Sequence, residues 1–172
     1  RTAQAAVEWI SANKDSDDWL IQVEMFDPHE PFYCTDKYRE MYNDTWDGPH
    51  FDWPSYDEVH ESPEAIAHIR KCYAGLLTMT DHWIGKIIDS LEENGILDDT
   101  LIIFTTDHGT MLAEHDYWMK NIMPMYNEIV RIPLIIRLPG KQKAGQRVDA
   151  LTQTIDIMPT ILEHFACPSP PH

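Results

Sequence analysis

The stretch LIIFTTDHG, Leu101–Gly109, decides the fold. Its first six residues are apolar or β-branched, which is typical of a strand buried on both faces. The polar pair Asp107 and His108 follows at once, and Gly109 then marks a loop at the carboxyl end of the strand. This pattern predicts a buried strand that is followed, at one edge of a sheet, by a carboxylate and an imidazole side chain.

A long helix is predicted upstream of this strand. Ser62 is an N-cap candidate, Pro63 fits the first helical turn, and Glu64 places a negative charge at the positive end of the helix dipole. The apolar periodicity continues until Gly95, which suits a left-handed C-cap. The predicted helix is therefore about 30 residues long, or on the order of 45 Å.

Two further apolar segments are predicted to be strands. They are WLIQVEMF, Trp19–Phe26, and IPLIIRL, Ile132–Leu138. Their apolar content on both faces is typical of buried parallel strands. We expect Trp19–Met25 and Leu134–Arg137 to share one sheet with Leu101–Thr105.

The order of the elements favours an α/β fold. Helices are also predicted at Thr2–Lys14 and Thr154–Phe165, close to the two ends of the chain. A strand, a long helix and another strand form a crossover, which joins parallel strands. We therefore expect a three-layer arrangement, with a mainly parallel sheet between helices. In such sheets, sites form beyond the carboxyl ends of the strands.

Length and charge limit the classes of function. The chain has 172 residues, one domain's worth, with 29 acidic and 13 basic residues and a formal net charge of −16. Nucleic acids and anionic membrane surfaces are therefore not expected as partners, because both need clustered Lys and Arg. A bound anion would need a local cation, because the overall field repels it.

The three cysteines, Cys34, Cys72 and Cys167, are too few for a disulfide framework and too scattered for a zinc ribbon. We interpret them as buried or idle thiols. Their odd number favours, without establishing, a reducing compartment such as the cytoplasm. Residues 36–61 form a polar and aromatic surface excursion, in which Tyr42–Tyr56 could wall a pocket.

Asp107 and His108 are candidate metal ligands. A carboxylate oxygen and an imidazole nitrogen both bind divalent ions, and both residues follow a buried strand. The alternative is structural: Asp107 caps the next segment and His108 faces solvent.

Lys120 and His29 are candidates for contact with a reacting anion. Lys120 lies 13 residues after Asp107 in a segment with few other bases, so it could clamp an oxyanion. His29 lies between Pro28 and Pro31 in a loop after a predicted strand, which suits a general acid or an oxyanion donor. The alternatives are a solvated surface lysine and a histidine hydrogen-bonded within its own turn.

Four segments in order resemble the formylglycine-dependent sulfatases of the alkaline-phosphatase superfamily. They are DPHEPF; YAGLLTMTDHWIGKIIDSLEENGILDDTLIIFTTDHGTMLAEHDYWMKN; VRIPLIIRLPG; and TIDIMPTIL. The resemblance extends from Trp19 to about Phe165, and its motifs agree in order and spacing as well as in residue type. It implies an alkaline-phosphatase-like three-layer sandwich, of which this chain would be the middle portion of the catalytic domain.

The resemblance also implies roles for individual residues. Asp107 and His108 match two ligands of a divalent metal, usually Ca²⁺, with Mg²⁺ or Mn²⁺ as alternatives. Lys120 matches the lysine that contacts the sulfate and the nucleophile. His29 matches the histidine that contacts the sulfate or assists the leaving group. The implied activity is hydrolysis of small sulfuric esters.

The chain departs from the family pattern in two respects. It has no C-x-P-x-R signature, whose cysteine becomes the formylglycine nucleophile, because Cys167 is followed by PSPP. It also lacks the upstream aspartates that complete the metal site. We therefore expect residues 1–172 to be a partial catalytic domain truncated at both ends and inactive alone, with formylglycine in the part that precedes it.

Two alternative functions are open at this point. One is a phosphonate or phosphate ester hydrolase of the same superfamily, because those enzymes share the Asp-His-Gly and lysine pattern. The other is a non-catalytic interaction module that kept the fold. An incomplete sheet would expose apolar surface, so self-association of the fragment is also expected.

Overall fold

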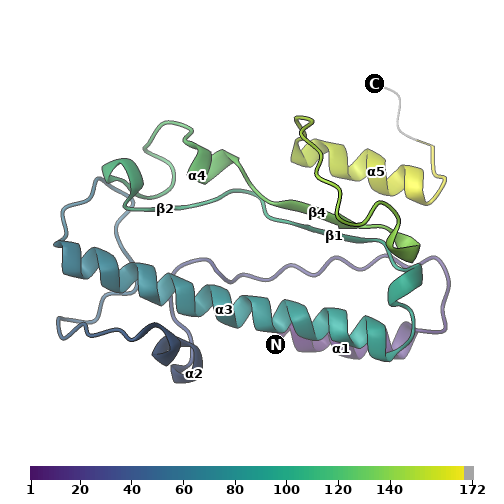
Figure 1. The fold of residues 1–172 in the computed structure, drawn as a ribbon, viewed down its shortest axis with the longest axis horizontal. Coiled ribbons are helices and arrows are strands. Elements are labelled where there is room, and N and C mark those ends of the chain that lie inside the picture. Colours follow the sequence, from purple (N-terminus) through teal and green to yellow (C-terminus); the bar gives the residue numbers. More distant parts are fainter. Residues whose placement is uncertain (169–172) are drawn as a thin grey trace.

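The long predicted helix is present in the computed structural model, which describes residues 1–168. Helix α3 spans Pro63–Glu93, and the Ser62 hydroxyl accepts a hydrogen bond from the Ala65 backbone N–H at 3.3 Å. The chain leaves the helix through Gly95, whose φ of 73° lies in the left-handed region that favours glycine. Helix α1, Thr2–Asn13, also agrees with the prediction and packs beside α3 (Figure 1).

Two predicted strands form one sheet. Strand β1 spans Ile102–Thr105 and strand β4 spans Leu134–Arg137. They pair antiparallel, with Ile102 opposite Arg137 and Thr105 opposite Leu134. The position of both strands and their common sheet are confirmed. Both strand pairs among residues 1–168 are antiparallel, so the parallel crossover expected within this part of the chain is absent from it.

The predicted strand Trp19–Phe26 is wrong. This segment has no regular secondary structure, although its side chains alternate between half-buried and exposed as in a strand. A strand is defined by a hydrogen-bonded partner, and the backbone of residues 19–25 has none among the described residues. The apolar pattern correctly indicated the alternating burial of these side chains. It could not predict whether another strand would pair with the segment.

A small hairpin follows β1. Strands β2, Met111–Leu112, and β3, Trp118–Met119, pair antiparallel around the short helix η3, Glu114–Asp116. The chain then forms the short helix α4, Asn127–Val130, before it enters β4. This path explains why β1 and β4 can run in opposite directions: a chain reversal connects them, not a crossover helix.

The core lies between the first half of α3, the hairpin and the excursion. The excursion begins with α2, Asp36–Arg39, and η1, Glu40–Tyr42. One buried cluster joins these elements, and its members are Phe32, Cys34, Tyr38, Ile69, Cys72, Leu76, Trp118 and Met119. The hairpin is therefore held in place by the same core that holds α3.

The C-terminal segment completes the arrangement. After the short helices η4, Pro139–Lys141, and η5, Thr154–Asp156, helix α5 spans Ile157–His164, which agrees with the prediction. In Figure 1 the β1–β4 pair lies between α3 and α5. Cys167 is exposed, and the remainder of the PSPP stretch beyond Pro168 lies outside the described residues.

Strand β4 carries a surface that the described residues leave uncovered. Leu134, Ile135 and Ile136 are all exposed, with Ile135 at 61%. An exposed run of large apolar side chains is typical of an interface. No helix among residues 1–168 has the length and apolarity that crossing a bilayer requires.

Gly109 is fixed by a close backbone approach. A Cβ atom there would lie 1.8 Å from the Glu128 carbonyl oxygen, and the Gly109 N–H already donates to Ile129 O at 2.8 Å. Replacing Gly109 by alanine is expected to lower the free energy of unfolding by about 2–3 kcal/mol, because the backbone must move apart. Chemical denaturation of the protein measures this change.

Gly85→Ala is the matched control for Gly109→Ala. Gly85 lies inside α3, and a Cβ atom there meets nothing within 4 Å. Alanine is favoured over glycine in a helix by up to about 1 kcal/mol, so this variant should be at least as stable as the wild type. Equal effects of the two substitutions would contradict the close-approach explanation.

Candidate active site

Lys120 and His29 are in direct contact. The Lys120 Nζ atom lies 3.1 Å from the His29 Nε2 atom, although 91 residues separate them. Lys120 directly follows strand β3, and His29 lies in the loop that contains two prolines. An ammonium group can only donate, so Nε2 accepts this hydrogen bond.

The other ring nitrogen of His29 fixes its tautomer. Nδ1 lies 2.9 Å from the Glu30 backbone oxygen, so it carries the proton and donates. It also lies 3.3 Å from Oε2 of the buried Glu30 side chain, and the ring packs on Phe26 with centroids 4.4 Å apart. His29 therefore presents a lone pair to Lys120 and holds the ammonium in place.

Asp107 and His108 form the second half of the site. The Asp107 Oδ1 atom accepts hydrogen bonds from the His108 N–H at 2.9 Å and from the Thr106 hydroxyl at 3.3 Å. Slight burial raises the pKa of Asp107, but these hydrogen bonds and the nearby His108 outweigh it, so the pKa is lowered overall. The carboxylate is thus ionised and 81% exposed, so a cation can reach it from solvent.

His108 is oriented as metal-ligating histidines are. Its Nδ1 lies 2.8 Å from the Gly109 carbonyl oxygen, to which it donates. Nε2 therefore carries the free lone pair, and it lies 3.5 Å from Asp107 Oδ2. A divalent ion could be bound by both atoms, since a backbone carbonyl commonly fixes the tautomer of such a histidine.

A single cavity joins the two halves. It has a volume of about 230 Å³, and both His108 and Lys120 line it, together with Met123, Met125 and Ile129. His29 reaches this cavity through Lys120, whereas Asp107 lies outside its wall. The structure therefore places two of the four candidate residues in the wall of one cavity, with His29 in contact with Lys120 and Asp107 beside His108.

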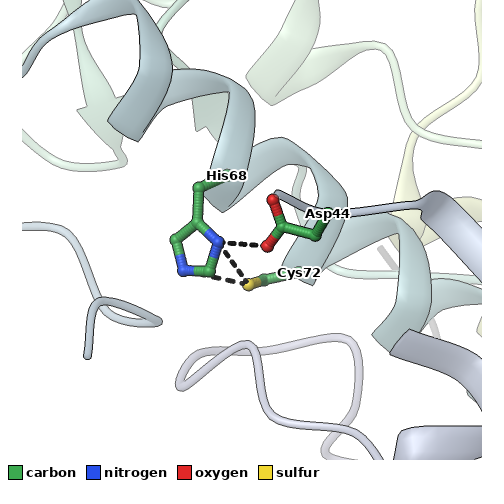
Figure 2. Close-up of side chains that lie close together, drawn as sticks. All are labelled: Asp44, His68 and Cys72. Atoms are coloured by element: carbon green, nitrogen blue, oxygen red, sulfur yellow. Dashed lines mark hydrogen bonds and ion pairs between the residues drawn. The ribbon is translucent and has the colours of Figure 1, made fainter. Parts of the chain in front are cut away.

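The structure also reveals a cluster that the sequence did not suggest. Asp44, His68 and Cys72 bring a carboxylate oxygen, an imidazole nitrogen and a sulfur within 4.8 Å of one another (Figure 2). The sequence contains part of the pattern of this cluster, because His68 and Cys72 are four residues apart on one helix and therefore lie on the same face. Asp44 lies in the excursion, whose residues 43, 44 and 46 line a cavity other than the one at Lys120.

Cys72 gives this cluster a characteristic response to alkaline pH. Burial, and then the charges of Asp44 and Asp52, raise the pKa of the Cys72 thiol from 9.0 to about 11. The thiol ionises in the unfolded state first, so its contribution to stability is complete below pH 9 and is lost as the pH rises towards 11. The free energy of unfolding of metal-free protein is expected to fall across this range.

Cys72→Ala isolates this contribution. The decline between pH 9 and pH 11 should become shallower by on the order of 2 kcal/mol, as urea denaturation at each pH would measure. Cys167→Ala is the control, because Cys167 is exposed and should leave the decline unchanged. A wild-type decline in the Cys72→Ala variant would show that other groups cause it.

Lys120, the two imidazoles and the Asp107 carboxylate form a candidate site for a small oxyanion in an α/β protein. Comparison with known proteins makes the class specific. The chain belongs to the sulfatase family, whose family model matches residues 1–166. The resemblance drawn from the sequence motifs is thereby confirmed, and sulfatases are sulfuric ester hydrolases.

Individual relatives agree with this family. An arylsulfatase of Clostridium perfringens is 28% identical over 183 residues, covering 95% of this chain and 37% of that protein. The multifunctional alkaline phosphatase superfamily protein PehA of Trinickia caryophylli is 43% identical over 107 residues, covering 61% of this chain and 20% of that protein.

A solved structure shows the same fold. The phosphonate monoester hydrolase of Agrobacterium radiobacter matches with a TM-score of 0.75 at 28% identity, covering 96% of this chain and 38% of that one. The chain thus spans between 20% and 38% of the length of these relatives.

Proposed function

We propose that the protein containing this chain hydrolyses sulfuric esters, with Lys120, His29, Asp107 and His108 in its active site. The reaction takes a sulfate monoester and water to an alcohol and hydrogen sulfate. The observation that carries the proposal is the 3.1 Å contact between Lys120 and His29 beside a cavity that His108 also lines. A cation held in position next to a cavity suits an anionic substrate.

Lys120 would bind the sulfate group. Its ammonium has three N–H donors, and His29 accepts one of them, so the others remain for sulfate oxygens. The formal net charge of −16 makes such a local cation necessary. Because His29 fixes the direction of the ammonium, Lys120 needs little reorganisation when the substrate binds.

His29 would serve first as a positioning group for Lys120. Its Nδ1 proton is committed to the Glu30 carbonyl and its Nε2 lone pair to Lys120. If Lys120 turns towards bound sulfate, Nε2 becomes free to take up a proton and to donate it towards a leaving alkoxide. Both roles implied by the family resemblance are compatible with this geometry.

Asp107 and His108 would hold a divalent metal, for which Ca²⁺ is our first choice and Mg²⁺ or Mn²⁺ the alternatives. The Asp107 carboxylate supplies the oxygen ligand that Ca²⁺ prefers, and the free lone pair of His108, 3.5 Å away, offers a second donor to a divalent ion. Calcium takes six to eight oxygen ligands, so further ligands would come from outside this chain. When bound, the metal supplies positive charge that polarises the sulfate ester.

The remainder of the catalytic domain would supply the other parts. We expect the formylglycine nucleophile in the part of the protein that precedes residue 1. Residues 1–172 would be part of one catalytic domain, an alkaline-phosphatase-like sandwich with a mainly parallel sheet. The exposed side chains of β4 would then be covered by that remainder, and the isolated chain would self-associate through them.

A phosphonate or phosphate ester hydrolase is the second candidate function. It is favoured by the structural similarity to a phosphonate monoester hydrolase, at 28% identity over 96% of this chain. Tetrahedral phosphorus and sulfur oxyanions differ mainly in charge and would occupy the same cavity. Residues outside this chain would decide between them.

Steady-state assays of the full-length enzyme test the proposal. An aryl sulfate, an aryl phosphonate monoester and an aryl phosphate are compared at saturating Ca²⁺. The highest kcat/KM for the sulfate supports a sulfatase, and the highest value for the phosphonate supports the second candidate. No turnover of any of the three would favour a non-catalytic interaction module, and turnover by residues 1–172 alone would contradict the partial-domain assignment.

A further inference from the structure

We propose that Asp44, His68 and Cys72 form a zinc-binding site that is separate from the candidate active site. The three side chains converge from two elements, and Figure 2 shows Asp44 and Cys72 both turned towards the imidazole ring. None of them takes part in the proposed sulfatase chemistry, so the proposal stands independently of it.

The helix and the excursion each bring part of the ligand set. His68 and Cys72 are one turn apart on the same face of α3, which is the spacing that places two side chains side by side. Asp44 follows η1 and comes from a segment 24 residues earlier, and its carboxylate is hydrogen-bonded to His68 Nδ1. The Cys72 sulfur lies 3.9 Å from the same nitrogen.

The Cys72 sulfur lies 3.9 Å from His68 Nδ1 and 3.6 Å from Nε2, close to the separation that a shared ion requires, whereas Asp44 and His68 are hydrogen-bonded and would move apart to admit the ion. Around tetrahedral zinc, bonds of about 2.0–2.3 Å put neighbouring ligand atoms roughly 3.3–3.7 Å apart. The ion would replace the proton shared by Asp44 and His68, and the Cys72 thiol would release its proton to solvent. One carboxylate and one thiolate then balance the two positive charges of the ion.

The chemistry of the donors selects the metal. A thiolate is a soft ligand that favours Zn²⁺ over Ca²⁺ and Mg²⁺, whereas imidazole and carboxylate suit zinc as well. The Asp107 and His108 pair has no sulfur, so the two sites would differ in metal preference. A protein with both would bind a hard ion at one place and a thiophilic ion at another.

The surroundings provide access and support. A cavity of about 380 Å³ adjoins the cluster, with Asp44, Trp46 and His68 in its wall. A water molecule in this cavity would supply the fourth ligand. Trp46 stacks on the His68 ring with centroids 5.2 Å apart, and Lys71 lies 3.7 Å from Asp44 Oδ1, so both ligands are held from outside.

The role of the ion would be structural. Cys72 is only 6% exposed and belongs to the core cluster that joins α3 to the hairpin. Zinc bound there would fasten the excursion to α3 and thereby to this core. Binding that needs the folded arrangement adds to folding stability.

Cobalt substitution provides the direct test. The full-length enzyme is stripped of metal, saturated with Ca²⁺ to fill the hard site, and titrated with Co²⁺. We expect one equivalent to produce a thiolate-to-cobalt charge-transfer band in the near ultraviolet, and Zn²⁺ to displace it. Absence of the band would overturn the proposal.

Two variants assign the sulfur. Cys72→Ser should remove the charge-transfer band, whereas Cys34→Ser should retain it, because Cys34 is a buried cysteine of the same core cluster without a place in the ligand set. Retention of the band in Cys72→Ser would overturn the assignment. If Cys72→Ser does not fold, X-ray absorption of the zinc-loaded wild type replaces it, with one sulfur ligand expected and none contradicting the site.

Asp44→Asn tests the third ligand without a change of shape. It should weaken zinc binding by at least about 10- to 100-fold, because losing even a group that only supports a metal ligand has an effect of this size. Turnover of the aryl sulfate at saturating Ca²⁺ should stay at the wild-type level. Unchanged zinc affinity would remove Asp44 from the site, and a fall in turnover alone would contradict the separation of the two sites.

Discussion

Replacing Lys120 by alanine in the full-length enzyme is expected to lower kcat by about 100- to 1000-fold. The ammonium is held 3.1 Å from His29 Nε2 and faces a cavity, so its loss removes a donor that is already aimed at the reacting group. Steady-state kinetics with the metal saturating measure this effect. Near-wild-type turnover would make Lys120 an ordinary solvated lysine.

Lys120→Arg should rescue only part of the loss. A planar guanidinium keeps the charge but cannot reproduce the compact geometry that His29 accepts. Lys86→Ala is the matched control, because Lys86 is exposed and, among residues 1–168, is paired with Asp89 alone, at 3.2 Å. Such surface substitutions change stability by less than about 0.5 kcal/mol and should leave kcat unaltered.

Asp107→Ala is the second variant with a large expected effect. We expect activity to fall on the order of 1000-fold or more, because the change removes a negative charge and a coordination position together. Asp107→Asn retains an oxygen ligand, so raising the Ca²⁺ concentration should restore part of its activity. The measurement is turnover as a function of metal concentration.

The same experiment contains its controls. Asp89→Asn alters a half-exposed carboxylate that is ion-paired with Lys86 and should leave the calcium dependence unchanged. Removal of metal from the wild type by a chelator should abolish turnover, and added Ca²⁺ should restore it. Full activity of Asp107→Ala would refute its role as a ligand.

Features encoded by neighbouring residues were predictable from the sequence. Helix α3 begins and ends where Ser62 and Gly95 indicated, because capping depends on residues within a few positions. Strands β1 and β4 were found because their apolar runs are short and sharply bounded. The prediction for Trp19–Phe26 failed because pairing depends on a partner strand, which apolar alternation does not specify.

The candidate site was predictable in its members but not in its geometry. Motifs selected His29 and Lys120 separately, and only the fold brings residues 91 positions apart to 3.1 Å. The cluster around His68 could not be predicted for the same reason, since Asp44 joins it from the distant excursion. Contacts between distant segments follow from tertiary packing, which a single sequence encodes only indirectly.

The close approach of Gly109 to residues 128 and 129 limits which cavity residues can be changed to alter substrate preference. The Ile129 backbone oxygen accepts the Gly109 hydrogen bond, and the Ile129 side chain lines the cavity while packing in a buried cluster with Met111 and Met123. A change of this side chain would therefore disturb the core next to the Asp-His loop. Met125 lines the same cavity but is 79% exposed, and its backbone makes no hydrogen bond of this kind among the described residues. A combinatorial library should therefore vary Met125 and keep Ile129 constant, so that most variants with a changed substrate preference still fold.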